Sequence, residues 1–123
     1  MKNYIIETKF SNCTLKVKDV FSEDKLHFTL NIEIITSKFT TSYTFNELIY
    51  WQLPFKKKEN CLEIYDECSN DCRCIIDKEK IELIIKDDKI SNISLIKLNQ
   101  GEDQEKLIDF IIELNALCET LLK

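Results

Sequence analysis

Four of the six cysteines fall within CLEIYDECSNDCRC, residues 61–74, where acidic side chains surround them. Zinc needs four ligands that converge at about 2.3 Å for thiolates, and most such sites draw two of them from a CxxC pair. The spacings Cys61 to Cys68, Cys68 to Cys72 and Cys72 to Cys74 contain no such pair. If Cys61 and Cys68 lie near the two ends of one strand, a rise of about 3.3 Å per residue separates them by roughly 20 Å. At most three thiols, those of Cys68, Cys72 and Cys74, can therefore share a metal ion.

The alternative is that these cysteines serve as small apolar residues in a reducing compartment. The sequence contains no apolar run long enough for a signal peptide or a membrane-spanning helix, which favours a cytoplasmic protein without a membrane partner. We therefore expect free thiols, no metal and no cofactor. A disulfide between Cys68 and Cys72 would form only on exposure to air.

No constellation of catalytic residues stands out. His27 is the lone histidine, and it alternates with the apolar residues of its segment, which predicts a solvated position. A single glycine leaves no phosphate-binding loop, and there is no GxSxG or HExxH motif. We expect a protein that is not an enzyme.

The charge balance narrows the class of partner. Seventeen basic and twenty-two acidic residues give a net charge of −5, which repels nucleic acid and favours a basic protein partner. Acidic residues crowd the segment after Cys61, next to an aromatic residue that can anchor an interface. The predicted partner-binding residues are Glu63, Tyr65, Asp66, Glu67 and Asp71.

Alternating apolar and polar residues predict strands along most of the chain. The first two hairpins combine residues 4–10 with 13–20, and 26–36 with 39–45. A β-meander follows, with turn-forming groups between its four segments. Its segments are residues 61–67, 72–77, 80–86 and 89–98.

Two segments have the period of a helix. In residues 44–53, Thr44 and Glu47 match a capping box, and Pro54 ends the segment, so we expect a helix of about two turns there. Residues 102–123 form a long amphipathic helix that Asn99 or Asp103 can cap. Its apolar stripe comprises Leu107, Ile108, Phe110, Ile111, Leu114, Leu117, Cys118 and Leu121.

These elements together predict one α+β domain over residues 1–123. Its antiparallel meander sheet of about eight strands carries the short central helix and the long C-terminal helix packed on it. The sheet is either open or strongly curved and barrel-like, because a pleckstrin-like barrel contains similar elements.

The order of elements resembles that of small bacterial toxin-immunity proteins of the WapI type. The matching pieces are FNELIYWQL at 45–53, the meander, and GEDQEKLIDFIIELNALCETLL at 101–122, where the pair Asp103 and Gln104 opens the helix. The resemblance implies a bacterial protein that binds and neutralises a cognate toxin without catalysis. It implies no particular binding residue, because such families bind toxins through variable surfaces. Two other hypotheses remain open: a phage- or host-encoded inhibitor or adaptor of pleckstrin-like build, and a small zinc-binding module.

Overall fold

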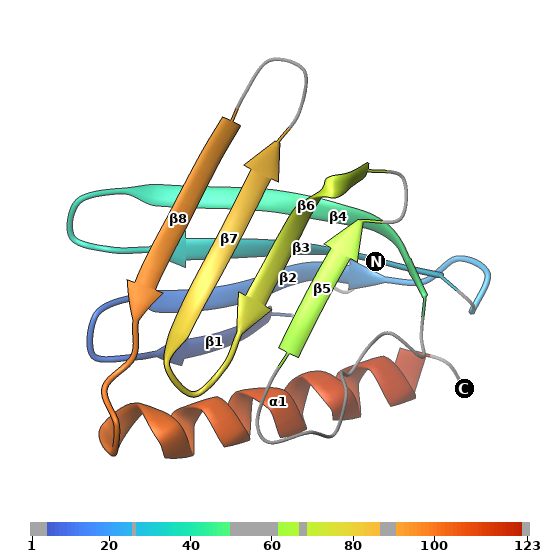
Figure 1. The fold of residues 1–123 in the computed structure, drawn as a ribbon. Coiled ribbons are helices and arrows are strands. Elements are labelled where there is room, and N and C mark those ends of the chain that lie inside the picture. Colours follow the sequence, from blue (N-terminus) through green and yellow to red (C-terminus); the bar gives the residue numbers. More distant parts are fainter. Residues whose placement is uncertain (1–4, 26, 50–61, 67–68, 87–90, 122–123) are drawn as a thin grey trace.

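The computed structural model describes residues 5–25, 27–49, 62–66, 69–86 and 91–121. In this part of the chain, two four-stranded antiparallel sheets face each other and a C-terminal helix lies along one side of the pair (Figure 1). The strands of the two sheets cross at a steep angle. The α+β class and the antiparallel pairing predicted from the sequence are confirmed.

The first sheet has the strand order β1-β2-β3-β4, so each strand pairs with its neighbour in the sequence. Alternation puts one apolar face of β2 and β3 into the core, where Leu15, Val17, Phe28, Leu30 and Ile32 are fully buried, and register shifts interrupt it in both strands. The strands are β1 (Ile5–Lys9), β2 (Thr14–Phe21), β3 (His27–Ile35) and β4 (Thr40–Ile49).

The second sheet repeats this topology with the order β5-β6-β7-β8. Its inner face carries fully buried Cys72, Cys74, Ile76, Ile81 and Leu83. The strands are β5 (Leu62–Asp66), β6 (Ser69–Ile76), β7 (Lys80–Lys86) and β8 (Ser91–Lys97).

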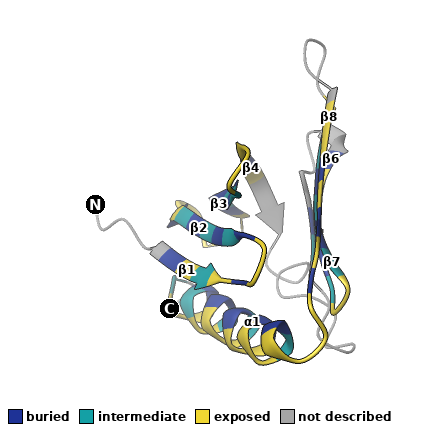
Figure 2. Cartoon of the chain, turned by 90° about the vertical axis from the view of Figure 1, so that its left-hand side faces the viewer, coloured by how far each residue is buried: buried dark blue, intermediate teal, exposed yellow. Residues whose placement is uncertain are grey.

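Helix α1 (Glu102–Leu121) lies below both sheets and covers the side of the core next to β1 (Figure 2). Leu107, Phe110, Leu114 and Cys118 are fully buried, as the apolar stripe predicted. Ile108 was predicted on the same stripe but is 38% exposed, because it lies at the edge of the buried arc. The core thus draws on both sheets and the helix.

Two expectations about the fold were wrong. The strands form two sheets instead of one. Of the two alternatives left open by the sequence, an open or a barrel-like sheet, the described strands form open sheets. The predicted helix at 44–53 also fails, because residues 44–49 belong to β4 and residues 50–53 lie outside the described part of the chain. Pairing with β3 explains this: Phe45 lies opposite Leu30, and Ile49 opposite His27. An isolated two-turn helix is marginal, whereas the ladder satisfies the same backbone groups.

The first turn of α1 is tied to distant parts of the chain by the buried carboxylate of Asp103. It accepts the backbone N–H of Ser11 at 2.9 Å, the Ser11 hydroxyl at 2.7 Å and the backbone N–H of Asn99 at 2.7 Å. Gln104 donates to the carbonyl of Lys78 at 2.6 Å. The predicted capping residue therefore links the β1–β2 turn, the end of β8 and the helix.

The electrostatics of Asp103 match this role. Burial alone would raise the pKa of its carboxyl, but hydrogen bonds from Ser11 and Asn99, together with the nearby charge of Lys106, lower the pKa below its ordinary value. The single glycine, Gly101, precedes the helix with φ at +123°, a conformation that other residues rarely adopt. No helix in the described ranges is long and apolar enough to cross a membrane.

Candidate functional site

The outer face of the second sheet points away from the first sheet and α1 (Figure 2). This face carries a row of aliphatic side chains. Ile75 and Ile84 are half-buried, whereas Ile93 is 60% and Leu95 51% exposed. The register aligns Ile84 with Ile93 across β7 and β8. We call these four residues the outer aliphatic row. No described element covers it, which makes it a candidate interaction surface.

The row ends at a groove along the edge of β8. The groove has a volume of about 490 Å³ and is lined by Asn92, Ile93, Ser94 and Leu95 of β8 and by Phe39 and Thr41 at the start of β4. The Ser94 hydroxyl donates to Thr41 Oγ1 at 3.3 Å, which holds the edges of the two sheets together. Phe39 is 40% exposed, so the groove offers an aromatic side chain beside the aliphatic row.

Charged side chains surround the outer aliphatic row. Lys80 and Glu82 form an ion pair at 3.5 Å on β7. Arg73, Lys86 and Lys97 are exposed, while Glu63 is half-buried in β5. An apolar centre with a polar rim is the usual composition of a protein-binding surface.

The residues predicted to bind a partner are placed only in part. Glu63 is paired with Ile75, which puts it beside the outer aliphatic row. The backbone register sets Tyr65 opposite Arg73 and Asp66 opposite Ser69. Asp71 lies in β6, and Glu67 falls outside the described residues. The acidic hairpin therefore stays a prediction, and it continues the same sheet as the row.

The described cysteines among the candidate metal ligands lie on the opposite face of the second sheet, toward the core. Cys72 and Cys74 lie on one face of β6, as expected, and both are fully buried in the core. Burial, together with the charge of Glu82, raises the pKa of the Cys74 thiol to about 12, so the thiol stays protonated at neutral pH. Zinc binds the thiolate. Cys61 and Cys68 are outside the described residues, and the described ones contain no cluster that could hold a metal ion.

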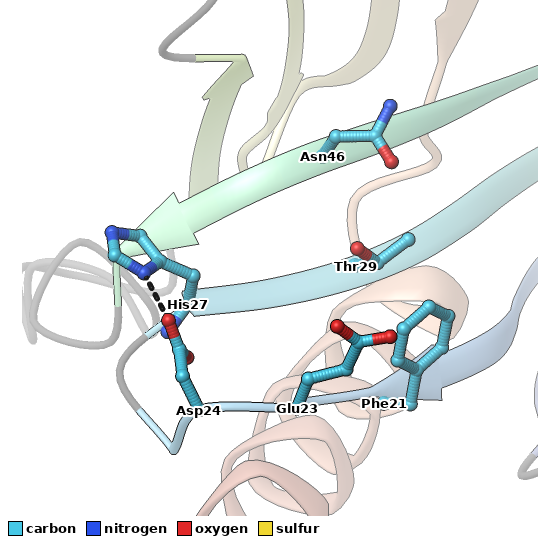
Figure 3. A pocket seen from close by; sticks show the side chains of 6 residues that line it. All are labelled: Phe21, Glu23, Asp24, His27, Thr29 and Asn46. Carbon is cyan, nitrogen blue, oxygen red and sulfur yellow. Dashed lines mark hydrogen bonds and ion pairs between the residues drawn. The ribbon is translucent and has the colours of Figure 1, made fainter.

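The histidine lies in an open pocket of about 560 Å³, shown in Figure 3. Its Nδ1 lies 2.7 Å from Asp24 Oδ2, and its backbone N–H donates to Asp24 Oδ1 at 2.7 Å. Thr29 and Asn46 from β3 and β4, with Phe21 and Glu23, complete the lining. The contacts between Asp24 and His27 close the turn between β2 and β3.

A second exposed surface lies along α1. Ile112 is 60% and Ile108 38% exposed on the side away from the core. The acids Glu105, Asp109, Glu113 and Glu119 accompany them, and the last turn of the helix has no basic residue. Glu105 in the first turn suits the positive end of the helix dipole, whereas Glu119 in the last turn faces its negative end.

Apolar residues on both faces of β8 could have indicated the outer aliphatic row from the sequence. Ile93 and Leu95 occupy one face of β8, while Ile96 and Leu98 at its end face the core. Apolar residues on both faces are typical of a strand covered on both sides. This pattern therefore indicates a covering partner for a face that no described element covers.

Comparisons with protein-family models, with curated proteins and with solved structures returned no match.

Proposed function

We propose that the protein is a non-catalytic binding protein that neutralises a cognate toxin by stoichiometric contact, in the manner of a bacterial immunity protein. The observation that carries the proposal is the outer aliphatic row, where Ile93 and Leu95 are more than half exposed beside a groove with Phe39. Removing this apolar surface from water upon binding is the main source of affinity. Such a protein would act in the cytoplasm.

The charge distribution supports a protein partner that is basic overall. The chain carries a net charge of −5, and acids lie along the outer side of α1. The predicted hairpin residues Glu63, Asp66, Glu67 and Asp71 would add acidic contacts at the β5–β6 end of the row. Complementary charge speeds encounter, and its effect falls with added salt.

A growth assay tests the proposal. The C-terminal domain of a large toxin encoded beside this gene is expressed together with the chain. The wild type should restore growth, and the double variant Ile93→Asp/Leu95→Asp should lose protection because it places two charges in an apolar contact. Ile112→Asp on α1 is the matched control with equal exposure, and it should still protect.

Failure of the wild type to protect would remove the proposal. Full protection by the double variant would instead remove the outer aliphatic row from the contact. Charge reversal of Glu63, Asp66, Glu67 and Asp71 tests the hairpin in the same assay, and loss of protection is expected.

The fold favours a second candidate of another class. Two crossing antiparallel sheets with a C-terminal helix along one side are similar in layout to the pleckstrin-like build, which suits an inhibitor or adaptor that recognises a peptide. A neighbouring toxin gene favours immunity, whereas a phage operon favours this candidate. The buried, protonated Cys74 argues against the third hypothesis, a zinc-binding module.

A further inference from the structure

Strand β8 is the end strand of its sheet. It pairs with β7 along its whole length, from Ser91 opposite Lys86 to Lys97 opposite Lys80, without a register shift. Its other edge has no strand partner among the described residues. In an antiparallel ladder, alternate N–H and C=O groups point away from the neighbour. Alternate backbone groups of β8 therefore point away from β7, and at the end of the strand the Lys97 carbonyl accepts the side-chain amide of Asn12 at 3.0 Å.

This edge lacks the features that keep exposed strands from pairing. Soluble proteins protect edge strands with bulges, prolines, inward charges or a covering element. β8 has no proline, no bulge in its pairing with β7, and a single charged residue, Lys97, at its end. Ile93 and Leu95 instead make it apolar.

The position of the first sheet restricts what can pair there. The β3–β4 hairpin extends past β8, so it backs the space beside the free edge (Figure 1). An added strand would lie with its inner side chains over Phe39 and Thr41, which line the groove. A second copy of this chain would bring its own first sheet into the layer that the hairpin already occupies. A single extended segment fits beside the hairpin, whereas the first sheet of a second copy would collide with it.

The charges beside the groove define the chemistry of that segment. None of the six lining residues is charged. Lys38 precedes Phe39, and Lys97 follows two residues after Leu95; both are exposed. A segment with aliphatic side chains at alternate positions and an acidic residue at its ends complements this arrangement.

We propose that the free edge of β8 binds an extended, aliphatic segment with acidic ends from a partner protein, which adds to the second sheet as a fifth strand. The inference extends the proposed function. It rests on that function in one respect only, namely that the partner is a protein. Backbone hydrogen bonds provide the affinity, and the groove at Phe39 and Thr41 selects the side chains.

A peptide titration of the full chain tests this directly. The probe is a synthetic peptide of alternating valine and threonine with a glutamate at each end, and amide hydrogen exchange of β8 is followed by NMR. At about ten times the dissociation constant, exchange of the alternate β8 amides that face the groove should slow about tenfold. Two further peptides, N-methylated on either set of alternate amides, separate backbone pairing from side-chain contact, and one of them should lose binding.

A matched pair of variants locates the site. Phe39→Ser should weaken peptide binding several-fold, whereas Phe21→Ser should not, although Phe21 is 36% and Phe39 40% exposed. No slowing in β8, or equal slowing by both methylated peptides, would overturn the inference. So would a dimer whose β8 amides are protected without peptide. Growth protection without peptide binding would overturn this inference alone, and peptide binding without protection would overturn the proposed function alone.

Discussion

The helix end at Asp103 and the free edge of β8 lie at the two ends of the same short segment. At the helix end a polar group is buried and hydrogen-bonded, whereas at the edge apolar groups are exposed. At the helix end a buried carboxylate accepts three hydrogen bonds, from Ser11 and Asn99. At the edge, Ile93 and Leu95 stay more than half exposed beside unpaired strand groups. The first arrangement is complete among the described residues, whereas in the second no described element covers the exposed side chains.

This difference separates stability from binding. Buried groups with full hydrogen bonding are costly to change, because a partner is left unsatisfied. Exposed aliphatic residues contribute little to folding, so their presence needs another reason. The helix end should therefore govern the free energy of unfolding, and the edge should govern recognition.

The largest effect is expected on the core side of α1. Phe110→Ala removes a fully buried ring and should lower the free energy of unfolding by about 3–5 kcal/mol, as measured by urea denaturation. Ile112→Ala, on the 60% exposed side of the same helix, should change it by no more than about 0.5 kcal/mol. Similar losses for both variants would contradict the assigned helix orientation.

Asp103→Asn should have the next largest effect. The amide keeps the shape but removes the charge and replaces one of the two accepting oxygens with an NH2 donor, so a donor from Ser11 or Asn99 loses its acceptor and a loss of about 2–3 kcal/mol in unfolding free energy is expected. Glu102→Gln, one residue earlier and exposed, is the control and should be near neutral.

The effect of Asp103→Asn on the free energy of unfolding should depend on pH. The folded-state pKa of Asp103 lies below its ordinary value of 3.8, so the carboxylate stabilises the fold fully above that value. This contribution is lost as the pH falls through the lower folded-state pKa. The stability gap between wild type and Asp103→Asn, measured from neutral pH downward, should therefore stay constant and then shrink below pH 3.8. A gap that widens in acid would contradict the hydrogen-bonded carboxylate.

The smallest effect on folding is expected at the edge. Ile93→Ser/Leu95→Ser should cost about 1 kcal/mol or less, because both side chains are already more than half exposed. The same double variant should lose growth protection against the toxin. A large loss of stability would show that these residues belong to the core. It would contradict the proposed difference between the helix end and the edge of β8.

Local patterns predicted most of the fold because they depend on neighbouring residues. Alternation located the strands, as in β2, where Leu15 and Val17 are buried. The capping box at Thr44 and Glu47 misled, because pairing of residues 44–49 with β3 outweighs a short helix. The division into two sheets depends on how hairpins pack, which no local period records.

The candidate site shows the same limit. Asp103 was predicted as a helix cap, but its contact with Ser11 joins residues 92 positions apart, which spacing does not reveal. The cysteine cluster suggested a metal site from residue types alone, although Cys72 and Cys74 face the core. The apolar residues on both faces of β8 were the better guide to the exposed apolar surface, because Ile93 and Leu95 lie on it.

Native-state amide hydrogen exchange of the isolated chain, followed by NMR, tests the contrast between the two ends most directly. The account predicts that the amides of Ser11 and Asn99, which donate to Asp103, exchange only through global unfolding. It also predicts that alternate amides of β8, those not bonded to β7, exchange rapidly. Protection of every β8 amide to the level of Ser11 would contradict the account, because the edge would then already be covered.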